Sequence, residues 1–131
     1  MSTPSNIIVA GNALNGLYVM ARVRKASGAI ILQSDVTSIA WFTTDANFPA
    51  VQVATGALVV ASTVYNTLQT RVNDPRWPAD APISGYNFGA QIPGSAFPLG
   101  AARYVTRIDI TPTAGDIITI QLENDTAVHI P

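Results

Sequence analysis

Residues 63–99 read TVYNTLQTRVNDPRWPADAPISGYNFGAQIPGSAFPL, and the rest of the predicted fold is arranged around them. Its middle part contains three prolines, at positions 75, 78 and 82. Each proline lacks a backbone N–H and restricts the residue before it, so this part cannot be a helix. Its aromatic residues Trp77, Tyr86 and Phe88 are large side chains that favour burial. We therefore expect an ordered crossover loop between two layers of β-structure, anchored by Trp77.

The sequence on both sides of this stretch alternates between apolar and polar residues, as half-buried strands do. Residues 17–25 (LYVMARVRK) and 103–111 (RYVTRIDIT) are clear examples. The alternation breaks around Ser38, which indicates a β-bulge or a strand start there. Residues 51–60 predict two short strands hinged at Thr55 and Gly56. Further strands are expected at residues 6–10, 29–33, 35–44, 62–70, 86–92 and 117–123.

These segments amount to about seven to nine short strands without a convincing helix, a rhythm typical of sandwiches. The predicted fold is all-β: a single antiparallel β-sandwich, Ig-like or jelly-roll-like, with a long Pro-rich crossover loop. The Cys…Trp…Cys pattern of true immunoglobulin domains is absent, because the chain has no cysteine. Residues 1–6 are expected to form an N-terminal arm, and residues 7–131 a single sandwich domain.

The composition indicates a surface that is partly buried against other protein. Hydrophobic residues make up 48% of the chain and charged residues only 11%, well below the usual share of charge. The net charge of −1 gives no basic footprint for nucleic acid and no polybasic membrane patch. The N-terminus has no signal-peptide pattern, and no apolar run is long enough for a membrane helix. The expected place of assembly is the cytoplasm.

The basic residues favour contacts with protein, since all except Lys25 are arginine. Arginine suits interfaces because its planar guanidinium is weakly hydrated and pairs with two acceptors at once. The interface residues predicted on this basis are Arg22, Arg24, Arg71, Arg76, Arg103 and Arg107. The aromatic residues predicted as structural anchors are Trp41, Trp77, Tyr86, Phe88 and Tyr104.

No residue set predicts catalysis, a metal site or a cofactor. His129 is the only histidine and lies close to the C-terminus, where rigid partners for a general base or metal ligand are rare. Asp74, Asp80 and Asp109 could form a carboxylate pair or a Ca²⁺ site, but the DxDxDG spacing is missing and loop aspartates usually cap turns. Trp41 and Trp77 could also form a sugar-stacking platform, although core or loop anchors are the commoner role.

Several runs of this sequence form a recognisable core: Val64–Thr70, Asp74–Trp77, Gly85–Phe88, Ile92–Pro93, Ala96–Pro98, Tyr104 and Ile110–Asp116. They resemble a family of small uncharacterised tailed-phage and prophage structural proteins with a "DTLQTDDRW…GYNF…FP" core. The matching residues lie between about 60 and 116, and this sequence departs from the pattern at Asn66 and at residues 71–73, where the family is more acidic. The resemblance implies a domain similar in style to Ig-like phage accessory domains, among them decoration and baseplate proteins, and brings no catalytic residues.

Resemblance and composition together predict a non-enzymatic virion protein of a tailed bacteriophage. The expected role is a capsid decoration (cement) protein, a homo-oligomer with a trimer favoured, whose partner is the major capsid protein or another virion protein. No nucleic acid, membrane or cofactor partner is expected. The alternatives are a neck, tail or baseplate component and a carbohydrate-binding, adhesin-like module. An enzyme is the reading that the sequence favours least.

Overall fold

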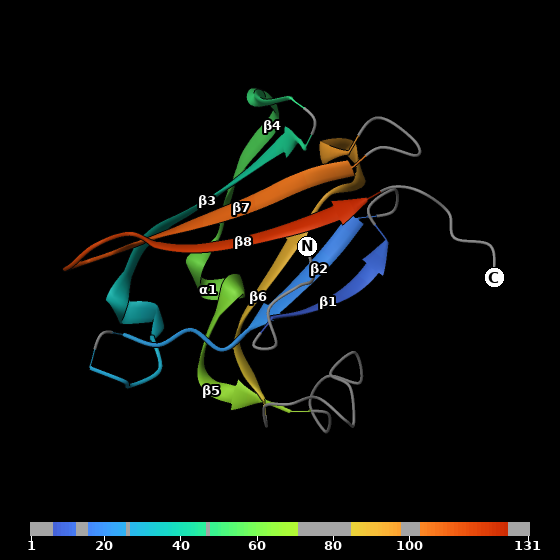
Figure 1. Cartoon of the computed structure of the whole chain (residues 1–131). Helices are drawn as coiled ribbons and strands as arrows, with labels where there is room; N and C mark the ends of the chain where they lie inside the picture. The colour runs from blue at the N-terminus through green and yellow to red at the C-terminus, as the bar shows by residue number, and fades with distance from the viewer. Residues whose placement is uncertain are drawn as a thin grey trace.

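Two four-stranded antiparallel sheets pack face to face in the computed structural model (Figure 1). The structure describes residues 7–12, 16–25, 27–46, 48–70, 85–97 and 103–125. The first sheet has the order β1 (Ile7–Asn12), β2 (Gly16–Ala21), β6 (Tyr86–Ile92), β5 (Val64–Gln69). The second sheet has the order β4 (Phe48–Leu58), β3 (Val36–Asp45), β7 (Arg103–Pro112), β8 (Ile118–Asp125).

This strand order is that of an Ig-like sandwich, with strands A, B, E and D in one sheet and C′, C, F and G in the other. The prediction of an all-β antiparallel sandwich is therefore confirmed. Three short helical turns interrupt the described strands. They are η2 (Gln33–Asp35), α1 (Val60–Thr63) and η3 (Gly94–Ala96). No helix in the described ranges is long and apolar enough to span a membrane.

The core lies between the sheets and is built from alternate residues of the central strands. The strand at residues 103–111 behaves as predicted, since it forms β7 and buries one face in the core. The strand predicted at residues 17–25 forms β2 but ends at Ala21, and its inner face packs into the same cluster. The first sheet contributes Leu17, Val19, Ala21, Phe88, Ala90 and Ile92, and the second contributes Ile39, Trp41, Tyr104, Ile108, Ile110, Ile120 and Leu122. Burial of these apolar surfaces is the main favourable term in folding.

The predicted irregularity near Ser38 is confirmed, because the β3–β7 register shifts between Val36 and Ser38. The prediction of a strand at residues 29–33 is wrong: this region forms only one isolated bridge, between Arg24 and Ile30, before η2 begins. Residues 62–70 begin in α1 and continue as β5, so the strand there starts at Val64.

The prediction of two short strands at residues 51–60 is also wrong, since β4 runs without a break from Phe48 to Leu58. Gly56 does not hinge this strand. It lies directly opposite Trp41, and a Cβ at position 56 would come within 2.6 Å of three atoms of the indole ring. The glycine makes room for the tryptophan inside a continuous strand.

The predicted Trp77 crossover loop and the predicted arm at residues 1–6 lie outside the described residues. Burial of the first sheet is not confined to its inner face. Met20, on the face of β2 opposite Val19, is fully buried as well. The sequence alternation of β2 therefore identifies the inner face correctly, but the opposite face is not simply a solvated one.

Candidate functional site

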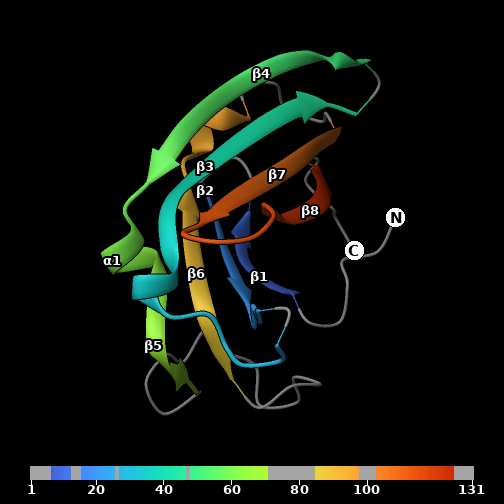
Figure 2. The same cartoon turned by 90° about the vertical axis from the view of Figure 1, so that its left-hand side faces the viewer.

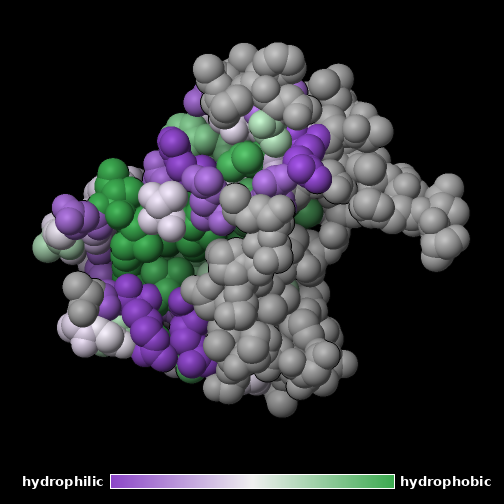
Figure 3. Space-filling model, viewed as in Figure 1, coloured by the Kyte–Doolittle hydropathy of each residue, from purple (hydrophilic) through white to green (hydrophobic). Residues whose placement is uncertain are grey.

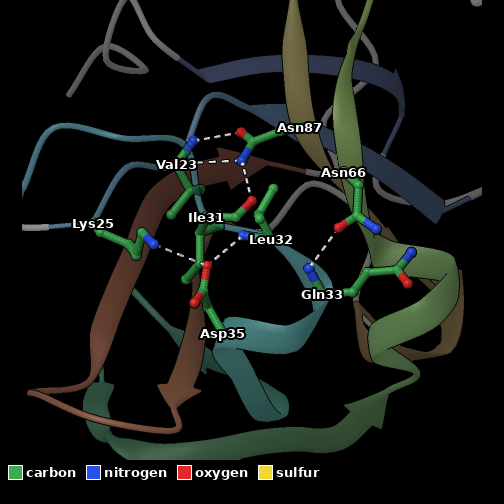
Figure 4. A network of polar contacts seen from close by, with 8 residues as sticks. All are labelled: Val23, Lys25, Ile31, Leu32, Gln33, Asp35, Asn66 and Asn87. Carbon is green, nitrogen blue, oxygen red and sulfur yellow. Dashed lines mark hydrogen bonds and ion pairs between the residues drawn. The ribbon is translucent and has the colours of Figure 1, made fainter.

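The segment from Arg22 to Asp35 leaves the first sheet and crosses to the start of the second, and one buried amide holds it in place (Figure 4). Asn87 Oδ1 accepts a hydrogen bond from Val23 N at 2.7 Å. Its Nδ2 donates to the carbonyl oxygens of Val23 and Ile31, both at 3.0 Å. Asn87 is 0% exposed, and its side chain supplies the buried Val23 N–H and Ile31 carbonyl with partners and the Val23 carbonyl with a second donor besides Ile31 N.

Sequence reasoning missed this role of Asn87. The residue stood within the GYNF motif, and no function was predicted for it. The available signal was an amide in a strand otherwise made of apolar and small residues, YNFGAQI. A polar side chain in such a strand needs hydrogen-bond partners when it is buried, and an asparagine can supply both a donor and an acceptor to a neighbouring backbone.

Asp35 organises the far end of the same segment (Figure 4). Its Oδ2 accepts from Leu32 N at 3.0 Å and lies 3.3 Å from Lys25 Nζ. The Leu32 backbone hydrogen bond, followed by the hydrogen bond and charge of Lys25, lowers the pKa of Asp35 below its usual value. The backbone carbonyl of Asp35 accepts from Thr113 N at 2.9 Å, which ties the segment to the β7–β8 turn.

Gln33 connects the segment to the other side of the sandwich. Its backbone N–H donates to Asn66 Oδ1 at 2.9 Å, and its side-chain amide donates to the carbonyl oxygens of Ala61 and Val64 at 3.2 and 2.8 Å. The segment is thus fixed to β6, to the β7–β8 turn and to the α1–β5 junction.

Between this segment and the β7–β8 turn lies a pocket of about 510 Å³. Figure 3 shows green, hydrophobic atoms on this side of the molecule between purple, hydrophilic groups. The apolar lining residues are Ile31, Pro112, Ile117 and Ile118, and the charged ones are Arg24, Lys25, Asp35 and Asp116. The two positive and two negative side chains balance, so the pocket has no preference in sign of charge, and no aromatic ring lines it for sugar stacking.

A second candidate surface is the side of the sandwich formed by β4, α1 and β5, which we call the uncharged margin. Residues 46–70, which include all three elements, contain no charged side chain. Figure 2 shows β4 as the outermost strand of its sheet, leading into α1 and then β5 at the left of the view. The absence of charge from residues 46–70 is visible in the sequence, but the charged fraction of 11% for the whole chain does not reveal it.

The core is also incompletely covered at the uncharged margin. Val59, between β4 and α1, is 68% exposed. Most of the partly buried hydrophobic residues that pack against the core in the described ranges belong to β4 and α1. They are Val53, Ala54, Leu58 and Val60, with Ile118 as the one described example elsewhere. The only other large hydrophobic residue that is exposed in the described part of the chain is Ile117, at 58%, on the rim of the pocket.

The predicted aromatic anchors in the described part of the chain are buried: Trp41, Tyr86, Phe88 and Tyr104. Trp41 is 7% exposed and packs against Gly56, so it offers no ring face to a sugar. Trp77, the remaining candidate for a stacking platform, lies outside the described residues.

The four predicted interface arginines in the described ranges each have a partner within the chain. Arg22 Nε donates to the Gly85 carbonyl at 3.3 Å, and Arg24 Nη1 donates to the Gly28 carbonyl at 2.7 Å. Arg103 and Arg107 share the outer face of β7, where Arg103 pairs with Glu123 at 3.0 Å. Arg71 and Arg76 lie outside the described residues.

Arg107 has the most complete set of intramolecular partners on the outer face of β7. Its guanidinium carbon lies 4.6 Å from the centre of the Phe42 ring, and its Nε lies 3.3 Å from Asp109 Oδ1. Asp109 also accepts from Thr119 Oγ1 at 3.1 Å. Asp109 is therefore part of a cross-strand polar cluster, while Asp74, Asp80 and His129 lie outside the described residues.

Within the ranges that the structure describes, no group of three or more His, Cys, Asp or Glu side chains could hold a metal ion. The two candidate surfaces in the described ranges are therefore an amphipathic pocket and an uncharged margin that exposes Val59. No family model, no curated protein and no solved structure matches the chain.

Proposed function

We propose that this chain is a non-enzymatic structural protein of a tailed-phage virion. In this proposal it works as a homo-oligomeric capsid decoration protein that binds the major capsid protein and stabilises the shell through repeated contacts between subunits. The single observation that carries the proposal is the uncharged margin, where two strands and the link between them contain no charge and the core is left partly open.

The physical argument concerns what association does to such a margin. Docking against protein removes apolar surface from water, which stabilises a contact by about 25 cal/mol for each Å² buried. A charged margin would oppose this through the cost of desolvating its ions. At the uncharged margin that cost is absent, so small contacts remain favourable. In a symmetric assembly each such contact is repeated for every subunit.

The resemblance to phage structural proteins supports the same assignment from a separate direction. The matching residues, about 60–116, include α1, β5, β6 and all of β7. The motif thus covers part of the uncharged margin and the two central strands that support the core. Its residues Tyr86 and Phe88 are buried, which is the behaviour of a scaffold.

Binding to capsid shells tests the proposal. The purified chain is mixed with shells assembled from the major capsid protein of the same gene neighbourhood and sedimented, and we expect it to travel with the shells. Val59→Glu places a charge on the uncharged margin without removing a buried side chain, and we expect it to weaken binding at least tenfold. The loss follows because an oligomer that comes apart no longer binds at several points at once.

Ile117→Glu is the matched control, since Ile117 is the other large exposed hydrophobic residue in the described ranges. It lies on the pocket rim, away from the uncharged margin, and this variant should bind shells as the unmodified chain does. Absence of the chain from the shell fraction would overturn the decoration role. Equal loss in both variants would show that the uncharged margin has no special part in it.

The same observation is compatible with a second role, as a component of the neck, tail or baseplate. An uncharged margin suits a closed ring as well as a shell, because ring subunits also bury their sides against neighbours. The mass in solution separates the two roles. Rings of six or twelve copies that ignore capsid shells would favour the second role over decoration.

A further inference from the structure

β4 is an edge strand that lacks the usual protection against pairing. It is the outermost strand of the second sheet, so one row of its backbone N–H and C=O groups faces away from β3. Natural edge strands are protected by charges, prolines, bulges or short length. β4 runs from Phe48 to Leu58, the longest strand in the described residues, and has no charge.

The protection that β4 does have is confined to its first half. Pro49 lies near the start, and the register with β3 shifts between Thr43 and Asp45. From Ala54 to Leu58 the pairing with β3 is regular. This second half therefore presents an even ladder of backbone groups to any strand that approaches it.

The other edges of the sandwich differ from β4. β5 is uncharged, but its register with β6 shifts between Val64 and Gln69, which removes a regular template. β8, the opposite edge of the second sheet, contains Glu123 and Asp125. Among the edges whose side chains are described, β4 thus combines neutrality with a regular ladder.

We propose that β4 pairs antiparallel with β4 of a second copy of this chain, across a two-fold axis at Gly56. The contact joins the two second sheets into one continuous eight-stranded sheet. The inference deepens the proposed function, on which it rests, by naming the contact between subunits and the residues that form it.

The neutrality of β4 is the reason to choose a second copy as its partner. In an antiparallel pair about a two-fold axis, a strand meets its own sequence, so a charge of either sign faces a like charge nearby and destabilises the contact. A strand that pairs with a foreign protein is free of this restriction, because opposite charges on the partner can match its own. Because β4 contains no charge, no like charges come together about such an axis.

An axis at Gly56 also aligns apolar and small side chains. Ala54 of one copy lies opposite Leu58 of the other, and Thr55 lies opposite Ala57. The exposed Val59 lies opposite the half-buried Val53 of the second copy, which covers part of the open core. A two-fold contact of this kind differs from the trimer that the sequence led us to expect, because a three-fold ring has no two-fold axis.

Light scattering on the purified chain, without capsid protein, tests the pairing. We expect a particle of twice the 13.8 kDa chain mass. Ala57 is exposed on the outer face of β4, and Ala57→Lys should raise the dissociation constant at least a hundredfold, because two lysines would meet near the axis. Gln121→Lys, at an exposed position on β8, is the matched control and should leave the mass unchanged.

Disulfide cross-linking tests the register, and the absence of native cysteine makes the result simple to read. In the proposed register, the double variant Thr55→Cys/Ala57→Cys places each new thiol opposite a thiol of the second copy, within reach of a disulfide. Mild oxidation should convert most of the protein into a reducible dimer. The control pair Thr119→Cys/Gln121→Cys on β8 should not form one.

Several results would overturn the pairing: a monomer, a trimer, an Ala57→Lys variant with unchanged mass, or a dimer that cross-links through β8. Each can be separated from a failure of the decoration role. A β4-linked dimer that ignores capsid shells supports the pairing and contradicts decoration. A trimer that binds shells supports decoration and contradicts the pairing.

Discussion

The uncharged margin and the charged end of the sandwich, where residues 22–35 meet the β7–β8 turn, solve the same problem in different ways. Both are places where the chain passes between the two sheets. At the charged end, polar side chains form hydrogen bonds with the backbone of residues 22–35, and the Lys25–Asp35 ion pair is partly exposed to solvent. At the uncharged margin no charge is present and part of the core is left accessible. The charged end is closed by contacts within the chain, whereas in the proposed function the uncharged margin is completed by another protein.

The largest loss of stability should come from Asn87→Ala, which removes the hydrogen bonds that hold the charged end. Val23 N and the Ile31 carbonyl lose their side-chain partner, while the Val23 carbonyl keeps its hydrogen bond from Ile31 N. Each unsatisfied group costs about 1–3 kcal/mol. We expect the free energy of unfolding to fall by about 4 kcal/mol, measured by urea denaturation.

Asn66→Ala is the control for this prediction. Asn66 is an exposed asparagine that accepts one hydrogen bond, from Gln33 N, so its removal should cost about 1 kcal/mol or less. Equal losses for the two variants would contradict the view that the charged end is held by one buried amide.

The corresponding change at the uncharged margin is Gly56→Ala, whose effect should be somewhat smaller. The added Cβ would lie 2.6 Å from the Trp41 ring, so the indole must move within a packed core. Overpacking of this kind typically costs 1–3 kcal/mol, and we expect a loss of about 2–3 kcal/mol in the same denaturation experiment.

A double-mutant cycle with Trp41→Phe checks the cause. Phenylalanine lacks the five-membered ring and has no Nε1 to collide with the new Cβ, so Gly56→Ala should cost less in the Trp41→Phe background than alone. Strictly additive losses would show that Gly56 is required for a reason other than the indole.

Asn87 and Gly56 also explain why the sequence predicts some strands correctly and others wrongly. The strands β2 and β7 were predicted because the alternation of apolar and polar residues is a local property of the chain. The two errors have non-local causes. The apolar run at residues 29–33 resembles a strand, yet the Ile31 carbonyl accepts its hydrogen bond from the Asn87 side chain, which is distant in sequence, rather than from a neighbouring strand. Gly56 resembles a hinge, yet its reason is Trp41 in the neighbouring strand.

The candidate surfaces were less predictable than the fold. Lys25 attracted attention only as the sole lysine, and its pairing with Asp35 depends on how residues 22–35 cross between the sheets. The predicted interface arginines were chosen by residue type, and the four in the described ranges have partners within the chain. The uncharged stretch at residues 46–70 could have been read directly, but its meaning depends on β4 being an edge strand.

A smaller effect is expected for Arg107→Ala on the outer face of β7, between the two regions. The variant removes a cation–π contact with Phe42 and a partly exposed ion pair with Asp109, and we expect a loss of about 1 kcal/mol or less. The ion-pair share of this loss should shrink in 1 M salt. A loss that is larger and independent of salt would mean that the Arg107 side chain contributes mainly through packing.

The smallest effect is the pH dependence of stability contributed by Asp35. It distinguishes the two regions most directly, since residues 46–70 contain no Asp, Glu, His, Lys or Arg. Hydrogen bonding from Leu32 N, and then Lys25, lowers the pKa of Asp35 in the folded protein from its ordinary value of 3.8. The ionised carboxylate is therefore favoured by folding. Its contribution to stability is complete above pH 3.8 and is lost as the pH falls below that value through the lower, folded pKa.

The difference in unfolding free energy between the native chain and Asp35→Asn should thus be constant near neutral pH and decrease in acid below pH 3.8. Lys25→Met should reduce this pH dependence without abolishing it, because the Leu32 N–H remains as the larger cause of the shift. If Lys25→Met removed the pH dependence altogether, the ion pair rather than the backbone turn of η2 would hold the charged end closed.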